Sequence, residues 1–164
     1  KNERILDFGC SRGYVVKSFR ELGYECYGTD ISEWAIDNAD QDVKKYLYLN
    51  NNCSLLGYHW IIAKDTFEHI ENINEVISSL MVCTKTGIFA VVPLSDTDGQ
   101  PYSVPEYELD ITHIHRLSLV TWIKMFVRPG WSIESRYHID GIKQNYYQWK
   151  TGNGFLTARR VKWL

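Results

Sequence analysis

The chain has 164 residues, 45% hydrophobic and 23% charged, which excludes a disordered or collagen-like chain and fits a single globular domain over residues 1–164. Lys and Arg number 18 and Asp and Glu 20, so the net charge of −2 argues against a dedicated duplex-binding protein. The sequence has no apolar run of about 18 residues and no signal-peptide pattern, so we expect no membrane association. Its four cysteines form no C-x-x-C pair, so we expect reduced thiols and a cytoplasmic location. The chain starts without Met, and we expect an upstream segment that is missing here.

Strand and helix patterns alternate along the first 92 residues. Short apolar runs predict strands, and apolar residues at helical spacing predict helices. The predicted strands are 4–8, 24–29, 45–49, 58–63 and 88–92, and the predicted helices are 14–22, one capped by Ser32, and 73–82. This alternation predicts an α/β fold with a doubly wound, mainly parallel sheet and helices on both faces.

The pattern breaks after Pro93, where residues 94–117 read as a long loop. A loop of this length in a compact domain is usually functional. Ser118 then caps a predicted helix that extends to Phe126, before a stop at Pro129-Gly130. The last two predicted strands, 131–139 and 155–161, flank a turn at 152–154, and we expect them to form an antiparallel edge pair.

The segment Asp7-Phe8-Gly9-Cys10-Ser11-Arg12-Gly13 joins the first predicted strand to the first predicted helix. Glycine lets backbone approach a ligand closely, and a helix N-terminus offers unpaired N–H groups. Ser11 stands where a dinucleotide fingerprint has its second glycine, and no G-K-[ST] follows, so neither that fingerprint nor a P-loop is present. A tight turn without a ligand remains the alternative interpretation.

Asp30 ends the second predicted strand. A carboxylate there can accept hydrogen bonds from both hydroxyls of a ribose. The alternative is that Asp30 caps the next helix, a role for which Ser32 competes. Ile31 adds an apolar side chain that could cover one face of a purine.

Five segments together resemble the class I S-adenosylmethionine (SAM)-dependent methyltransferases, specifically the small-molecule type in the methyltransferase 11/23 group. The five segments, in chain order, are Ile5–Gly13, Tyr27–Ser32, Ile61–Ile70, Gly87–Pro93 and Asp110–His113. The resemblance covers nearly the whole chain, and it implies the sheet order 3-2-1-4-5-7-6. Ser11 departs from the usual middle glycine of the first motif, and the helix that commonly precedes the first strand is missing.

The resemblance also implies how SAM would be held. Backbone around Gly9, Cys10, Ser11 and Gly13 would line its methionine part, and Asp7 would orient its ammonium group. Asp30 would bind the ribose, and Ile31 would pack on the adenine. One of Asn50, Asn51 and Asn52 would bond the adenine edge, with no choice among the three. Asp65 and Thr66 would face the methyl group and the acceptor.

Two clusters supply the catalytic candidates: Asp65 with Glu68 and His69, and Asp110 with His113 and His115. Carboxylates and imidazoles in one crevice could deprotonate a hydroxyl, and we take Glu68, His69 and His113 as the catalytic candidates. The same pattern resembles the metal site of some quinone and small-RNA methyltransferases, so a divalent metal stays open without being assigned. Glu68 could instead only stabilise the N-terminus of the following helix through the helix dipole, and His69 could be a packed polar residue bonded to backbone.

The expected function is transfer of a methyl group from SAM to a small-molecule acceptor, at oxygen, by a monomer or homodimer. One rival is a SAM-binding module without activity, and the other is an RNA methyltransferase that uses the basic, aromatic tail 141–164. An edge hairpin whose loop caps the sheet is the preferred interpretation of that tail, and nucleic acid is not the expected partner. The glycine spacing disfavours an NAD-dependent oxidoreductase.

Overall fold

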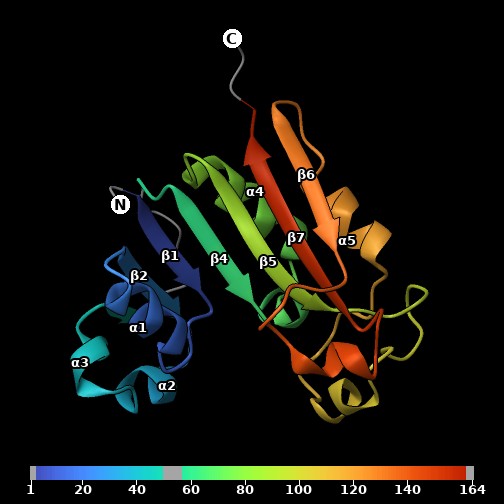
Figure 1. Ribbon diagram of the computed structural model, residues 1–164, viewed down its shortest axis with the longest axis horizontal. Helices are drawn as coiled ribbons and strands as arrows, with labels where there is room; N and C mark the ends of the chain where they lie inside the picture. The colour runs from blue at the N-terminus through green and yellow to red at the C-terminus, as the bar shows by residue number, and fades with distance from the viewer. Residues whose placement is uncertain (1–2, 50–56, 162–164) are drawn as a thin grey trace. The chain divides into compact units, whose positions relative to one another are not determined.

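The computed structural model describes residues 3–49 and 57–161 (Figure 1). Its strands form one seven-stranded sheet in the order β3-β2-β1-β4-β5-β7-β6 within these ranges. Strand β1 pairs in parallel with β2 and β4, β2 pairs in parallel with β3, and β6 is antiparallel to β7. This order and the α/β class are those predicted. The chain divides into two compact units, Lys1–Ala63 with Ser79–Ile88, and Lys64–Ser78 with Phe89–Leu164.

The first unit is built around the parallel strands that start the chain. Its elements are β1 (Arg4–Phe8), α1 (Tyr14–Glu21), β2 (Glu25–Asp30), α2 (Glu33–Asp37), α3 (Gln41–Lys44), β3 (Leu47–Leu49) and most of β4 (Trp60–Lys64). The helices bury their apolar side chains against the strands, as hydrophobic periodicity requires. The shared core consists of Ile5, Cys10, Val16, Cys26, Ile36, Ala39, Val43 and Leu47.

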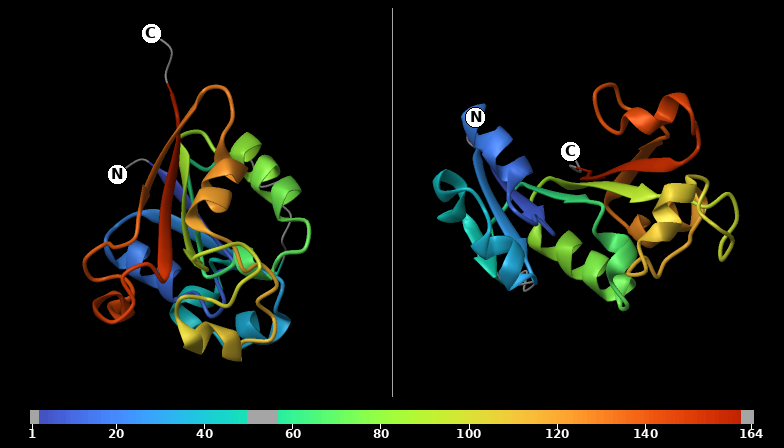
Figure 2. Two further views of the ribbon diagram at one scale, coloured as in Figure 1. Left: turned by 90° about the vertical axis from the view of Figure 1, so that its right-hand side faces the viewer. Right: turned by 90° about the horizontal axis from the view of Figure 1, so that it is seen from below.

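The second unit contains the antiparallel pair and the long loop. Its elements are the 3-10 helix η1 (Phe67–His69), most of β5 (Gly87–Pro93), η2 (Pro105–Leu109), α5 (Leu119–Phe126), β6 (Trp131–Arg136), η3 (Gln144–Tyr147) and β7 (Asn153–Arg160). The helix α4 (Ile73–Cys83) starts in this unit and ends in the first. Figure 2 shows α5 and the segment between β6 and β7 on opposite sides of those two strands.

Capping explains where α5 begins. The Ser118 hydroxyl accepts a hydrogen bond from the Thr121 N–H, as predicted for an N-cap. Asp98 accepts from the Ser118 N–H at 2.7 Å and from the Thr121 hydroxyl at 2.6 Å. These two bonds tie the long loop to the helix start. The buried side chains of Trp122 and Phe126 then fix the helix against its unit.

Most strand boundaries lie within one or two residues of those expected, and the larger differences are in the last two strands and in one short helix. Asn153 and Gly154 belong to β7 and not to a turn, and the side chains of Leu119 and Leu94 lie against Gly154. Strand β6 ends at Arg136, and Ile139 instead forms an isolated bridge with Ile142. The short helix α3 was not predicted, since four residues give too little periodicity. No helix in the described part of the chain has the length and apolar character needed to cross a bilayer.

Candidate functional site

The turn after β1 has the backbone geometry of a close-approach loop. Gly9, Ser11 and Gly13 adopt φ values of 78°, 47° and 79°, all in the left-handed region. The N–H groups of Gly9 and Cys10 both donate to the Thr29 carbonyl, at 2.9 and 3.0 Å. The loop is therefore fixed to the end of β2, and it leads into α1, whose start has no side-chain cap. Free helix N–H groups at such a turn suit a negatively charged ligand group.

Asp30 joins the loop to the start of α2. Its two carboxylate oxygens accept from the backbone N–H of Ser11 at 2.7 Å and of Ser32 at 2.8 Å. Ser32, not Asp30, is the side-chain cap of α2, accepting from the Ala35 N–H at 3.1 Å. Each carboxylate oxygen has further lone pairs, so Asp30 can also accept from ligand hydroxyls.

The remaining cofactor candidates of the first unit divide by burial. Asp7 is 3% exposed, whereas Ile31 is 74% exposed and has a free apolar face. Cys10 is buried, and burial, helped by Asp7 and Asp30, raises the pKa of its thiol far above the usual range. Cys10 therefore contributes backbone and bulk and no thiolate chemistry. Asn50, Asn51 and Asn52 lie outside the described residues.

Only glycine fits at position 28 in β2. A Cβ atom built there would lie 2.7 Å from both Cβ and Sγ of Cys10 and 2.9 Å from a methyl of Leu47. The bare backbone of Gly28 thus lets the Cys10 loop pack directly on the strand. The cysteines of the described ranges, Cys10, Cys26 and Cys83, carry free thiols, as expected, and Cys53 lies outside those ranges.

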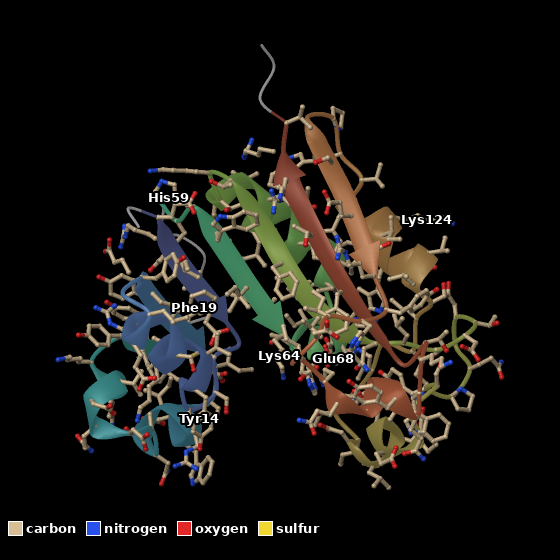
Figure 3. All side chains as sticks on the ribbon, in the orientation of Figure 1. Tyr14, Phe19, His59, Lys64, Glu68 and Lys124 are labelled. Carbon is tan, nitrogen blue, oxygen red and sulfur yellow. The ribbon has the colours of Figure 1, made fainter. Side chains whose placement is uncertain are left out.

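In the second unit, Asp65 follows the last residue of β4 in a strained conformation with φ 52°. Its carboxylate binds two ammonium groups, Lys143 Nζ at 2.7 Å and Lys64 Nζ at 2.5 Å. Figure 3 places Lys64 at the end of β4 and Glu68 close by. Burial lowers the pKa of Lys143, but Asp65 and the Tyr107 hydroxyl outweigh it, so the pKa lies above its usual value. Lys143 was not among the sequence-based candidates.

Glu68 is a buried acid with one unused oxygen. Its side chain is 1% exposed, and Oε2 has no hydrogen-bond partner among the described residues. Burial raises the pKa of Glu68 to about 8, so the group is mainly protonated at pH 7. Its backbone carbonyl accepts from the N–H groups of Ile114 at 2.9 Å and His115 at 3.3 Å, which holds the long loop beside η1.

His113 faces Glu68 with a defined ring nitrogen. Its Nδ1 lies 2.9 Å from the Tyr107 carbonyl oxygen, which can only accept, so Nδ1 carries the proton. In the neutral ring, Nε2 then presents a lone pair, 3.9 Å from Glu68 Oε1 and 3.6 Å from Asp110 Oδ2. Neither distance is a hydrogen bond, so that lone pair remains available.

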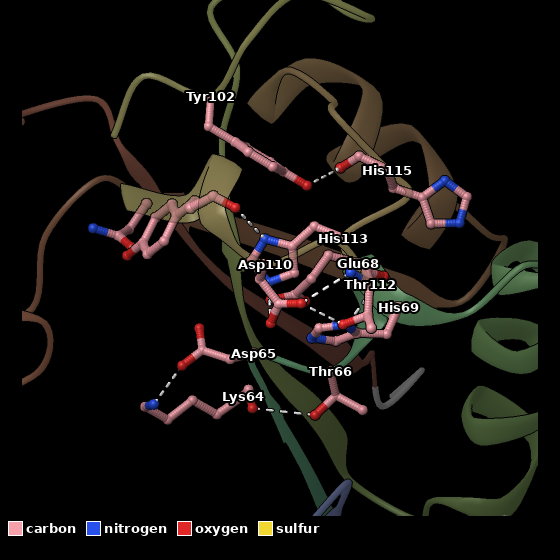
Figure 4. A network of polar contacts seen from close by, with 12 residues as sticks. Lys64, Asp65, Thr66, Glu68, His69, Tyr102, Asp110, Thr112, His113 and His115 are labelled. Atoms are coloured by element: carbon pink, nitrogen blue, oxygen red, sulfur yellow. Dashed lines mark hydrogen bonds and ion pairs between the residues drawn. The ribbon is translucent and has the colours of Figure 1, made fainter. Parts of the chain in front are cut away.

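His69 has the same tautomer by a different route. The Thr112 hydroxyl donates to Asp110 at 2.5 Å, so its oxygen, 2.9 Å from His69 Nδ1, acts there as an acceptor. His69 therefore also has its proton on Nδ1. Burial, the larger cause, and His113 lower the pKa of His69, which keeps the ring neutral at pH 7. Figure 4 shows the two imidazoles together, with ring centroids 4.7 Å apart.

The structure brings Glu68, His69, His113 and Asp110 together in the second unit, where Asp65 follows β4. It places the His115 ring apart from this cluster. The His115 Nε2 bonds the Ile70 carbonyl at 2.6 Å, and its ring packs near Trp122. Figure 4 shows that ring turned away from the other two histidines. Thr66 Oγ1 donates to the Lys64 carbonyl at 3.1 Å.

Three of these side chains could also hold a metal ion. Glu68, His69 and His113 each offer one ligand atom, and these atoms lie within 4.8 Å of one another. Two imidazole nitrogens and, once Glu68 gives up its proton, one carboxylate are a ligand set that suits Zn²⁺ or a similar divalent ion. Asp65, the other acid of the motif, is not in this group, because it is held by the two lysines.

Comparison with known proteins gives the family. A family model described as a methyltransferase domain matches residues 1–136. No match was found among the curated proteins.

Solved structures agree on the fold. The plantazolicin methyltransferase BpumL, solved with a monoazolic desmethyl analogue and SAH, is 17% identical with a TM-score of 0.73 over 98% of this chain and 76% of its own. A SAM-dependent methyltransferase from Archaeoglobus fulgidus is 16% identical, with a TM-score of 0.75 over 96% of this chain and 86% of its own. The methyltransferase in the Haloferax volcanii complex with the Trm112 activator is 12% identical, with a TM-score of 0.76 over 99% of this chain and 84% of its own. The chain belongs to the methyltransferase domain family, as a SAM-dependent methyltransferase of class I.

Proposed function

We propose that this protein transfers the methyl group of SAM to a hydroxyl oxygen of a small-molecule acceptor. The observation that carries this proposal is the Nε2 lone pair of His113, presented beside a neutral Glu68 by a bond from Nδ1–H to the Tyr107 carbonyl. Such a nitrogen can take the proton of a hydroxyl as its oxygen attacks the methyl carbon. Family membership supports SAM as the methyl donor, and the SAH bound to BpumL is consistent with it.

On this proposal, the first unit holds SAM. The left-handed turn at Gly9, Ser11 and Gly13 would cradle the methionine part, with Asp7 near its ammonium. Asp30 would accept from the ribose hydroxyls while keeping its two backbone donors, and the exposed Ile31 would cover the adenine. Asp65 and Thr66, directly after β4, would lie at the methyl group.

Transfer breaks the bond from sulfur to the methyl carbon and forms a bond from that carbon to the acceptor oxygen, leaving SAH. The acceptor proton passes to His113 Nε2, and no redox partner is needed. His69 would bind the acceptor through its own Nε2 lone pair. Neutral Glu68 can donate a hydrogen bond to a polar group of the acceptor, because burial keeps its proton on at pH 7.

The experiment is a transfer assay with isotope-labelled SAM against panels of hydroxylated small molecules, primary amines and total RNA. We expect label in hydroxylated products and its loss in His113→Asn, with SAH still bound. Label only in amines would overturn the choice of oxygen, and label only in RNA would establish the RNA rival. SAH binding without transfer to any panel would favour the inactive SAM-binding module.

Metal-assisted methylation is a second candidate, favoured by ligand atoms of Glu68, His69 and His113 within 4.8 Å of one another and by the unpartnered Oε2 of Glu68. A divalent ion held by Glu68, His69 and His113 would lower the pKa of the acceptor hydroxyl. Thermal unfolding with added Zn²⁺ or Mn²⁺ tests this, because a ligand of the native state raises the midpoint. We expect the rise to vanish in His69→Ala. An unchanged midpoint in the parent protein excludes this candidate.

A further inference from the structure

We propose that Tyr107 is a positioning residue that holds His113 in its Nδ1–H tautomer and couples this imidazole to the Lys143–Asp65 ion pair. The inference rests on the proposed function for the use of the His113 lone pair. Tyr107 lies in η2, inside the long loop, and none of the motifs in the sequence includes it. Two different groups of this one residue reach the two parts of the cluster.

The backbone of Tyr107 sets the ring nitrogen. Its carbonyl oxygen accepts from His113 Nδ1 at 2.9 Å. His113 is itself held by its N–H, which donates to the Asp110 carbonyl at 3.1 Å. The bond at Nδ1 decides which nitrogen keeps a lone pair, because a neutral imidazole has only one proton. A small movement of η2 would release the ring to the other tautomer.

The hydroxyl of Tyr107 fixes η2 in place. It donates to Asn153 Oδ1 at 2.6 Å and accepts from Asn145 Nδ2 at 3.0 Å. Asn153 Nδ2 in turn donates to Asn145 Oδ1 at 2.9 Å, which closes a ring of three hydrogen bonds. Asn153 is 1% exposed at the start of β7, so the ring is anchored in the core of the unit. The ring is half-buried, and a satisfied polar network with one member in the core favours a single geometry.

The same hydroxyl reaches the ion pair. Lys143 Nζ lies 3.4 Å from the Tyr107 oxygen and 2.7 Å from Asp65 Oδ1, and its ammonium sits 5.1 Å from the centre of the Tyr107 ring. Lys143 has φ 58°, a conformation that costs a side-chain-bearing residue free energy and that surrounding contacts must maintain. Tyr107 therefore connects the long loop with the segment before β7 and, through Lys143, with Asp65 at the end of β4.

Tyr102 provides a matched comparison in the same loop. Its ring packs edge-on against His113 at 5.4 Å, nearer than Tyr107 at 6.2 Å. Its hydroxyl, however, donates to the His115 carbonyl at 2.9 Å and so does not touch the Asn145–Asn153 ring. Loss of the Tyr102 hydroxyl removes its bond to the His115 carbonyl, whereas loss of the Tyr107 hydroxyl removes the bonds to Asn153 and Asn145. Only Tyr107 has a group bonded to the His113 nitrogen.

Nuclear magnetic resonance of ¹⁵N-histidine protein tests the inference without any acceptor. The chain has five histidines, and His113→Gln assigns the signal. We expect His113 in the parent protein to show Nε2 as the unprotonated nitrogen. In Tyr107→Phe we expect averaging of the two nitrogen shifts, as in a free imidazole, whereas Tyr102→Phe should keep the parent pattern. Asn145→Ala opens the same ring and serves as a second variant should Tyr107→Phe not fold.

Each outcome decides the inference. A parent protein with the proton on Nε2 overturns it, as does a parent-like His113 in folded Tyr107→Phe and Asn145→Ala. With an acceptor in hand, we expect Tyr107→Phe to lower kcat about 10- to 100-fold with KM for SAM unchanged, as for a displaced catalytic group. Failure of the transfer assay alone would count against the proposed function, and the tautomer measurement would still stand.

Discussion

Asp65 and Lys143 both adopt left-handed backbone conformations, with φ 52° and 58°, and their side chains form a 2.7 Å ion pair. Among the described residues other than glycine, only Ser11 shares such a φ, and it bonds Asp30 in the first unit. Strained residues persist where surrounding contacts hold them, and they gather at functional sites. Two of the three strained residues, Ser11 and Asp65, are candidate site residues, and the third, Lys143, forms an ion pair with Asp65.

Lys143→Met should destabilise the protein by about 1–2 kcal/mol, because Asp65 keeps Lys64 but loses its more buried partner. The Lys143 side chain is 17% exposed, so solvent screens this pair only partly. Urea unfolding of the variant measures the change. Lys124→Met on the exposed side of α5 is the control, and we expect it to stay within 0.5 kcal/mol, about the usual range for surface substitutions. Equal effects of the two variants would contradict a role for the ion pair.

Glu68→Gln should be more stable than the parent protein at alkaline pH. The folded pKa of about 8 exceeds the ordinary value of 4.5, so the folded state binds more protons between these limits. The contribution of Glu68 is therefore full below about pH 4.5 and is lost as pH rises through 8. We expect the stability gap between variant and parent to widen over this window by several kcal/mol.

Urea unfolding of both proteins from pH 4 to pH 9 measures that gap, with the exposed Glu134→Gln as the reference for solvent effects. A gap that does not change with pH would mean that Glu68 is ionised in the folded protein. A narrowing gap with rising pH would mean that a cation stabilises the carboxylate there.

Apolar runs and helical periodicity predicted the strands and the longer helices well, whereas the order of the strands came from the family resemblance and is confirmed. The antiparallel pair β6 and β7 was also expected, and it is confirmed. The short helix α3 was missed, since a single helical turn has no period. The strand start at Asn153 was misjudged because Gly152 and Gly154 resemble turn residues, whereas Gly154 has Leu119 and Leu94 side chains packed against it.

The candidate site was predicted less completely than the fold. His69, Glu68 and His113 fall together as expected from their spacing, and their roles remain predictions. Lys143 and Tyr107 were missed because each reaches the cluster from a loop far away in the sequence, and neither position has a motif. Tertiary hydrogen bonds, such as that from Tyr107 to Asn153, leave no local pattern.

Asp30→Ala should weaken SAH binding about 10- to 100-fold. The variant removes the carboxylate proposed for the ribose and also the acceptor of the Ser11 and Ser32 N–H groups. A hydrogen bond to a charged group contributes roughly 1.5–3 kcal/mol, and each 1.4 kcal/mol is about tenfold in affinity. Titration calorimetry with SAH measures the loss. Asp37→Ala, which removes an exposed pair with Lys44, is the control, and unchanged binding in Asp30→Ala would refute the ribose role.

Ser11→Gly should stabilise the protein by a few tenths to about 1 kcal/mol. Ser11 has φ 47°, a conformation in which a Cβ atom costs roughly 1–2 kcal/mol. Glycine removes this cost, but its greater freedom in the unfolded chain offsets part of the stabilisation. The bond from its N–H to Asp30 needs no side chain, so it is retained. SAH affinity should therefore be equal or higher. Ser11→Ala is the matched control, because it removes the hydroxyl and keeps the strained Cβ. If thermal unfolding shows the same gain in both variants, the cost lies in the hydroxyl; a loss in Ser11→Gly would show that the left-handed turn is not strained.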